Sequence, residues 1–124
     1  MRLALLATAA ALVLALAPGA GARIRDRYCS PTGDYCTSAQ KQAGAVKLIL
    51  STFSFSGRYR LCVKPTVGAQ TCKSFPLRRR GDLWRSVVTW HRNFPNRGTG
   101  IYRVTWFYGG TRLGPPLGFV VANT

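Results

Sequence analysis

Residues 101–108 read IYRVTWFY, and this stretch decides the fold class. Apolar and polar side chains alternate along it: Tyr102, Val104 and Trp106 share one side, and Arg103, Thr105 and Phe107 share the other. Alternation with a period of two predicts a β-strand that has one face on the core and the other toward solvent. Gly109-Gly110 follows directly and favours a hairpin turn.

A second stretch, RYRLCVK at 58–64, repeats this pattern. Its two sides separate as Tyr59, Leu61 and Val63 against Arg58, Arg60, Cys62 and Lys64. Further β-rich stretches occupy 46–55, 71–77, 83–91 and 117–122, and Pro76 favours an edge position for the third strand. No stretch has a helical period. Short strands at this spacing predict an all-β, antiparallel β-sandwich of six to seven strands.

Residues 100–106 (GIYRVTW) and 109–121 (GGTRLGPPLGFVV) resemble the last two strands of immunoglobulin-like and fibronectin type III domains. The resemblance covers residues 45–122 and implies an immunoglobulin-like sandwich in which Tyr102 occupies the tyrosine-corner position. Cys62 and Cys72 depart from the antibody pattern, because they are too close in sequence to join the two sheets. The chain as a whole also resembles small exported proteins of high-GC bacteria, which implies no activity.

The first 22 residues have the pattern of a secretory signal peptide. Arg2 precedes an apolar run from Leu3 to Ala17, and small residues follow as far as Ala22. The run is too short to span a bilayer, which takes about 20 apolar residues. We therefore predict cleavage near Ala22 and a secreted, extracellular protein. The remainder divides into a basic arm and disulfide loop at 23–44 and a β-sandwich domain at 45–124.

Four cysteines in an exported chain predict two disulfides. Proximity in sequence favours Cys29–Cys36, around a loop with Pro and Gly, and Cys62–Cys72, across a strand–turn–strand segment. An alternative is a four-cysteine zinc site, but the spacings lack the paired C-x-x-C that such sites use. We therefore expect two local disulfides, no bound metal and no cofactor.

The charge of the chain is strongly positive. It has 18 basic and three acidic residues, with a formal net charge of +15, and loss of Arg2 with the leader lowers this to +14. The acidic residues are Asp26, Asp34 and Asp82. Such a surface attracts polyanions. Most of the basic residues are arginine, which suits bidentate contacts with phosphate or carboxylate groups.

Catalytic residues are scarce. The chain has one histidine, His91, and no glutamate, so glycosidase and ribonuclease chemistry lack their usual pairs of acid and base. His91 with Asp82 leaves a Ser-His-Asp triad open by count alone, but no G-x-S-x-G motif accompanies it. A histidine at the end of a strand, exposed to solvent, is the simpler interpretation.

The candidate binding residues are cations and one aromatic side chain on outward positions. Arg58, Arg60 and Arg103 belong to strands expected to be neighbours, and Phe107 shares the side of Arg103. Arg78, Arg79 and Arg80 join two strands and would form the margin of this patch, whereas Arg112 is expected to contribute little. The competing interpretation is a solvated face without a ligand. Arg80-Gly81-Asp82 also matches an integrin-binding tripeptide, although a turn uses Gly and Asp in any case.

The sequence thus predicts a secreted, non-enzymatic basic module. Its expected partner is an anionic polymer, an acidic surface or an acidic protein outside the cell or in its envelope. An alternative is a structural or protein-interaction module whose charge serves only solubility, and a third is a small secreted hydrolase. Salt-sensitive binding distinguishes the first two.

Overall fold

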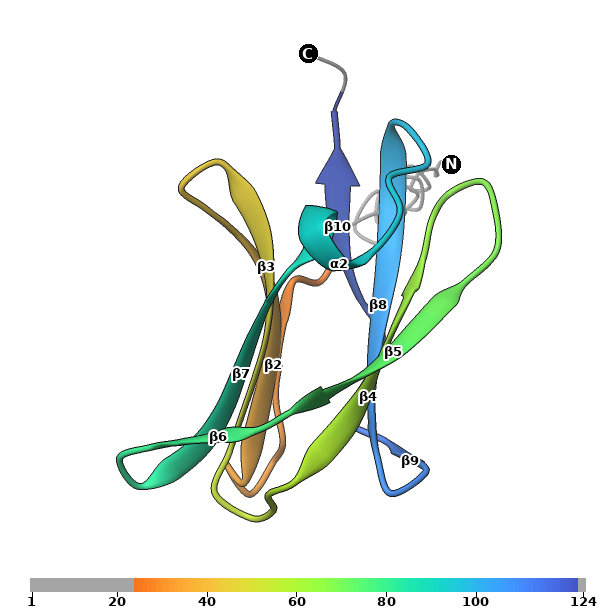
Figure 1. Ribbon diagram of the computed structural model, residues 1–124. Helices are drawn as coiled ribbons and strands as arrows, with labels where there is room; N and C mark the ends of the chain where they lie inside the picture. Colours follow the sequence, from red (N-terminus) through yellow and green to blue (C-terminus); the bar gives the residue numbers. More distant parts are fainter. Residues whose placement is uncertain (1–23, 123–124) are drawn as a thin grey trace, which may run out of the picture.

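The computed structural model describes residues 24–122, which form a two-layered β structure (Figure 1). The predicted signal peptide lies outside the described residues. The elements, in chain order, are β1 (Arg27–Cys29), β2 (Tyr35–Gln42), β3 (Ala45–Thr52), β4 (Arg58–Lys64), β5 (Thr71–Pro76), β6 (Arg78–Arg80), β7 (Leu83–Thr89), α2 (Trp90–Asn93), β8 (Gly100–Tyr108), β9 (Thr111–Arg112) and β10 (Leu117–Val121).

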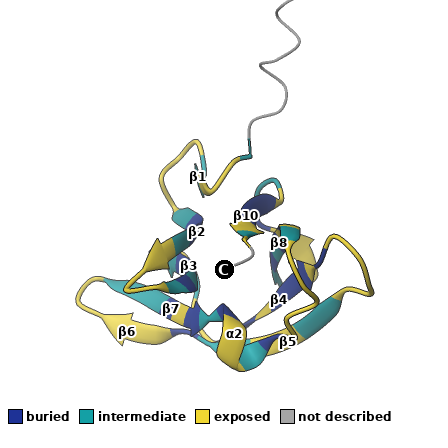
Figure 2. Ribbon diagram, turned by 90° about the horizontal axis from the view of Figure 1, so that it is seen from above, coloured by how far each residue is buried: buried dark blue, intermediate teal, exposed yellow. Residues whose placement is uncertain are grey.

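Two antiparallel sheets face one another. The first has the order β1-β2-β3-β7-β6, and the second has the order β10-β8-β4-β5, with β9 paired to β8. Seen from above, the sheets form two walls, with buried residues on their facing sides and α2 at the open edge between β7 and β5 (Figure 2). The prediction of an all-β antiparallel sandwich is confirmed.

The core lies between the sheets and contains the alternating inward residues of β4 and β8. Tyr59, Leu61 and Val63 of β4 are buried, as are Tyr102, Val104 and Trp106 of β8. The first sheet contributes Leu48, Leu50 and Val88 from β3 and β7. At 25 cal/mol per Å² of apolar area removed from water, each such side chain contributes about 1.5–3 kcal/mol before entropy losses.

Three segments differ from the predicted pattern. Residues 35–42, expected to be a loop and a polar link, form β2, which pairs with β3 along its whole length. The small residues Thr37, Ser38 and Ala39 are buried, but they lack the hydrophobic alternation that predicts a strand. The strand expected over 83–91 ends at Thr89, because Trp90 begins α2 and turns its ring into the core. Residues 78–80 form β6 rather than a turn.

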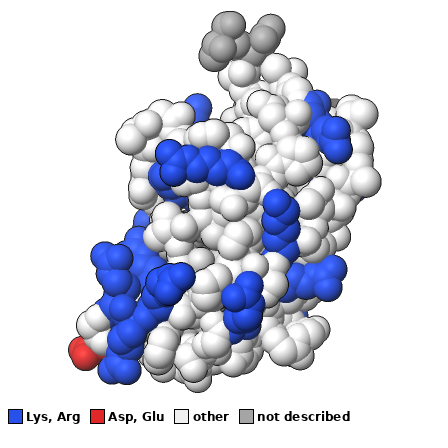
Figure 3. Space-filling view, viewed as in Figure 1, with Lys and Arg blue, Asp and Glu red and all other residues white. Residues whose placement is uncertain are grey.

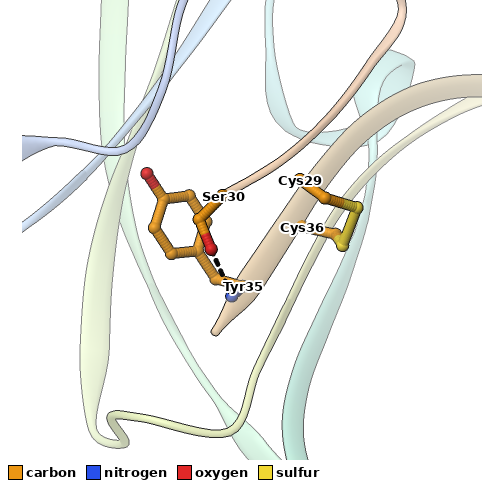
Figure 4. Close-up of a disulfide and its surroundings, with 4 residues drawn as sticks. All are labelled: Cys29, Ser30, Tyr35 and Cys36. Carbon is orange, nitrogen blue, oxygen red and sulfur yellow. Dashed lines mark hydrogen bonds between the residues drawn. A yellow bond between two sulfur atoms is a disulfide. The ribbon is translucent and has the colours of Figure 1, made fainter. Parts of the chain in front are cut away.

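Both predicted disulfides are present, and each joins residues directly opposite one another on paired strands. Cys29 and Cys36 connect β1 to β2, beside a bond in which the Tyr35 amide donates to the Ser30 hydroxyl over 3.3 Å (Figure 4). Cys62 and Cys72 connect β4 to β5 on the outer side of the second sheet. Each cross-link therefore fixes the register of a hairpin.

The N-terminal segment connects the edges of the two sheets. The Asp26 carbonyl accepts from the Ala39 amide of β2, and the Arg25 carbonyl accepts from the Gly118 amide of β10 over 2.8 Å. Ile24 packs on Gly118, where a Cβ atom would lie 2.6 Å from its methyl group. The arm expected over 23–44 thus contributes strands to the first sheet, and the boundary expected at residue 45 falls between paired strands β2 and β3.

Candidate anion-binding face

The outer face of the second sheet brings together most of the predicted binding residues. Strands β4 and β8 are neighbours, as expected, and their register places Arg60 opposite Phe107 and Lys64 opposite Arg103. Alternation adds Arg58 to the same face, two residues before Arg60. We call this set the basic face: Arg58, Arg60, Lys64, Arg103, Phe107 and Arg112.

The sequence analysis expects little contribution from Arg112, but the register places this residue on the same face. The Gly109-Gly110 turn returns the chain as β9, with both glycines at positive φ and Arg112 directly opposite Phe107. Directly opposed residues of an antiparallel pair point to the same side of the sheet. Phe107 therefore lies between Arg60 and Arg112 in one row across three strands, and it is half-buried rather than fully exposed.

Hydrogen bonds hold two of these cations in place. The Arg58 guanidinium donates from Nε to the Ser74 hydroxyl over 3.1 Å and from Nη2 to the Ser74 carbonyl over 3.0 Å. Lys64 donates to the Gly68 carbonyl of its own hairpin over 3.0 Å. A side chain that is already ordered loses less conformational entropy when a ligand binds.

An open depression of ≈ 740 Å³ lies on the same face. Arg58, Arg60 and Phe107 line it, together with the Cys62–Cys72 disulfide and the bare Gly109-Gly110 backbone. None of the three acidic residues of the chain belongs to β4, β5, β8 or β9. The depression therefore combines an aromatic ring with a cationic rim, which suits an anionic ligand that also presents a flat surface for stacking.

Arg78, Arg79 and Arg80 belong to the first sheet, whereas the basic face belongs to the second. Leu77 is the only residue between β5 and β6, and there the chain crosses from the second sheet to the first, which is visible as the long diagonal in Figure 1. These arginines pair with β7, and Leu77 just before them donates its amide to the Gly57 carbonyl beside Arg58 over 2.7 Å. The crossing was not readable from the sequence, because Pro76 and Leu77 do not indicate which sheet the next strand joins.

The residues considered for catalysis do not meet. Asp82 immediately precedes β7 and His91 follows it, so the whole strand separates them. Seven residues at 3.3 Å each span about 23 Å, far beyond hydrogen-bond reach. Within residues 24–122, no group of three or more His, Cys, Asp and Glu side chains could hold a metal ion. In the same range, no helix is long and apolar enough to cross a membrane.

Comparison with known proteins adds a distant likeness. No protein-family model and no curated protein matches the sequence. One solved structure that resembles the fold is described as the crystal structure of a bromine derivative of BhCBM56, with a TM-score of 0.45 and 17% identity over 77% of this chain and 99% of that one. A likeness at this level carries no argument about ligand or activity.

Proposed function

We propose that this chain is a secreted, non-enzymatic module that binds an anionic partner at its basic face. The partner would be an anionic polymer, an acidic surface or an acidic protein of the cell envelope or the surrounding medium. The observation that carries the proposal is the row Arg60–Phe107–Arg112, which places an aromatic ring between two cations. Neighbouring strands lie about 4.8 Å apart, so these cations are anchored about 10 Å from one another.

Electrostatics supports binding more than folding. Lys64 and Arg103 are directly opposite one another, and like charges in that arrangement destabilise a sheet. Together with the net charge of the mature chain, this concentration of cations produces a positive field that raises the rate and strength of polyanion binding. Release of the partner's counterions would supply much of the free energy.

The scaffold and the compartment fit this role. The orders β2-β3-β7-β6 and β10-β8-β4 correspond to A-B-E-D and G-F-C of immunoglobulin-like sandwiches, and we infer that the domain is of that type. Two disulfides are typical of proteins in oxidising compartments, and the leader-like residues 1–22 would direct the chain there.

A second candidate function is a protein-interaction module without a polyanion ligand. It is favoured by one observation: Ile101 and Val120, directly opposite one another on β8 and β10, are 39% and 49% exposed. These side chains extend the outer face of the second sheet beyond Arg103 with an apolar surface. A partner that used them would bind with little dependence on salt.

The test is a pull-down from the secreting cell's own envelope fraction, with the mature chain as bait at low and at high salt. The proposal predicts capture of an anionic component at low salt and its loss at high salt. It also predicts loss of capture in the combined variant Arg58→Ala, Arg60→Ala and Arg103→Ala. Arg92→Ala, an exposed position on α2, is the matched control and should behave as wild type. Capture that withstands high salt and the triple substitution would contradict the proposal.

A further inference from the structure

A second cluster of arginines lies on the first sheet, at the hairpin of β6 and β7. Arg78 is directly opposite Arg85, and Arg80 lies two residues further along β6 on the same side. We call Arg78, Arg80 and Arg85 the arginine hairpin. Basic side chains gather in this region at the lower left of Figure 3, near a single acidic group.

The arrangement costs stability in the isolated domain. Like charges directly opposite one another on paired strands are destabilising. Arg79 is a contrast within the same hairpin, because its guanidinium lies 5.5 Å from the Trp84 ring and its Nε donates to the Gly81 carbonyl over 2.8 Å. Arg79 thus has a packing role that accounts for its presence, and the other three arginines need a different explanation.

Arg85 carries an unsatisfied donor. Its Nε is buried and has no hydrogen-bond partner among the described residues. A buried donor without an acceptor destabilises the fold. An oxyanion in front of Arg78 and Arg85 would pair with the two opposed guanidinium groups and neutralise their charge.

An open depression of ≈ 460 Å³ adjoins the cluster. Its lining includes Arg78, Arg80 and Arg85 together with the exposed Val87 and the side chain of Asn93. We propose that the arginine hairpin is a second binding site, for phosphate or sulfate groups of an anionic polymer. Arginine is suited to these groups, because its planar fork donates two parallel hydrogen bonds to one oxyanion.

Two sites on one domain have a consequence for assembly. The arginine hairpin belongs to the first sheet and the basic face to the second, and the two sheets are opposite walls of the sandwich (Figure 2). One molecule would therefore bind two segments of polyanion and cross-link them. Cross-linking rests on the proposed function of the basic face, whereas anion binding at the hairpin does not.

The first experiment maps binding on the mature chain by amide NMR, with short probes that cannot bridge two molecules. One arm uses tripolyphosphate and the other a heparin-derived sulfated tetrasaccharide, so that phosphate and sulfate sources are distinguished. We expect shifts of the β6–β7 amides with at least one probe, and about tenfold weaker binding there in Arg78→Gln with Arg85→Gln. Arg92→Ala should retain wild-type shifts. Unmoved β6–β7 amides with both probes would overturn the proposal.

A stability measurement on the same proteins guards against misfolding as an explanation. Without anion, Arg78→Gln should melt no lower than wild type, because it removes one of two opposed charges. With tripolyphosphate or tetrasaccharide present, wild type should gain more in melting temperature than the variant. Equal gains in both proteins would overturn the site, whatever the state of the basic face.

The second experiment measures light scattering of mature chain mixed with long, unfractionated heparin. Wild type should cross-link the polymer near equivalence. The hairpin variant and the basic-face variant should each bind without cross-linking. One informative result is that wild type binds the short probes at β6–β7 but does not cross-link heparin. That result would refute the role of the basic face and leave the hairpin site standing. Cross-linking that persists in the hairpin variant would refute the second site.

Discussion

Tyr102 ties the loop before β8 to the core of the sandwich. It is 1% exposed, and its hydroxyl donates to the Gly98 carbonyl over 2.7 Å while accepting from the Arg97 amide over 2.8 Å. This is the corner arrangement that the sequence predicted. Tyr102→Phe removes both bonds and should lower the free energy of unfolding by about 1–3 kcal/mol, measured by urea denaturation.

Tyr108→Phe is the matched control for that prediction. The Tyr108 hydroxyl donates to the Ser56 carbonyl over 2.8 Å in an exposed position, where water can replace it. Its loss should cost less than the loss at Tyr102. Equal stabilities of wild type and Tyr102→Phe would show that the corner bonds contribute nothing.

Tyr59 makes the domain sensitive to alkaline pH. Its hydroxyl and that of Ser86 lie 2.7 Å apart between the two sheets, and burial raises the pKa of Tyr59 to about 12, partly opposed by the bond to Ser86. The unfolded chain loses this proton near pH 10. The stabilisation is therefore complete below pH 10 and is lost as the pH rises toward 12, by about 2–3 kcal/mol in total.

Denaturation between pH 9 and pH 12 tests this prediction against Tyr59→Phe. The variant is less stable at neutral pH, because Ser86 loses its partner, but the phenylalanine cannot ionise. The difference between wild type and variant should shrink steadily across the window. Parallel pH profiles would mean that Tyr59 titrates normally.

At the level of elements, the β4–β5 hairpin is stabilised by its disulfide. Cys62 and Cys72 are directly opposite one another, and β5 is an edge strand that pairs only with β4 in the described structure. Replacing both cysteines with alanine should cost about 2–3 kcal/mol and leave the fold unchanged. Calorimetry and the amide spectrum of the variant check the two parts. Loss of the dispersed spectrum would show instead that the bond is required for folding.

The N-terminal segment should contribute to stability, because it bridges the sheet edges. Its contacts are the two backbone hydrogen bonds at Arg25 and Asp26, and the packing of Ile24 and Tyr28 on glycines of the C-terminal segment. A chain that begins at Arg27 should lose about 1–3 kcal/mol for the two bonds. Ile24→Ala keeps the two backbone hydrogen bonds, so its loss of stability measures the contribution of Ile24 packing alone. A truncated chain with wild-type stability would show that the segment is a passive arm.

Prediction from sequence succeeded where one face of a strand is buried and the other is not. β4 and β8 display that contrast in large side chains. The sequence therefore predicts their length, the side of each that faces the core, and their place as neighbours. β2 was missed, because it buries Thr37, Ser38 and Ala39, whose size and polarity resemble a loop. Trp90 ended β7 early, since its ring packs edge-on against Tyr102 and Phe119, contacts that only the tertiary structure creates.

The candidate site was predicted to the same extent. Arg58, Arg60, Arg103 and Phe107 followed from alternation, because neighbouring strands carry their outward residues on one face. Arg112 and the position of β6 depended on connections: the Gly109-Gly110 turn and the crossing at Leu77. A local pattern does not show where a connection sends the next strand.

At the scale of the whole molecule, the sandwich separates its packing from its charge. Large apolar side chains fill the space between the sheets, while the cations lie on the outer faces and on the hairpin. The few acidic residues leave most of these cations without partners of opposite charge. Such a surface favours polyanions over neutral ligands, and its attraction weakens as salt screens it.

The salt dependence of binding tests the account most directly. The affinity of the mature chain for a defined polyanion, such as heparin, is measured over a series of salt concentrations, and log affinity is plotted against log salt. We predict a straight, steep fall. The slope should decrease by roughly one for Arg112→Ala and by roughly three for Arg58→Ala with Arg60→Ala and Arg103→Ala, and it should remain unchanged for Arg92→Ala. An identical slope in wild type and the triple variant, or binding that ignores salt, would contradict the account.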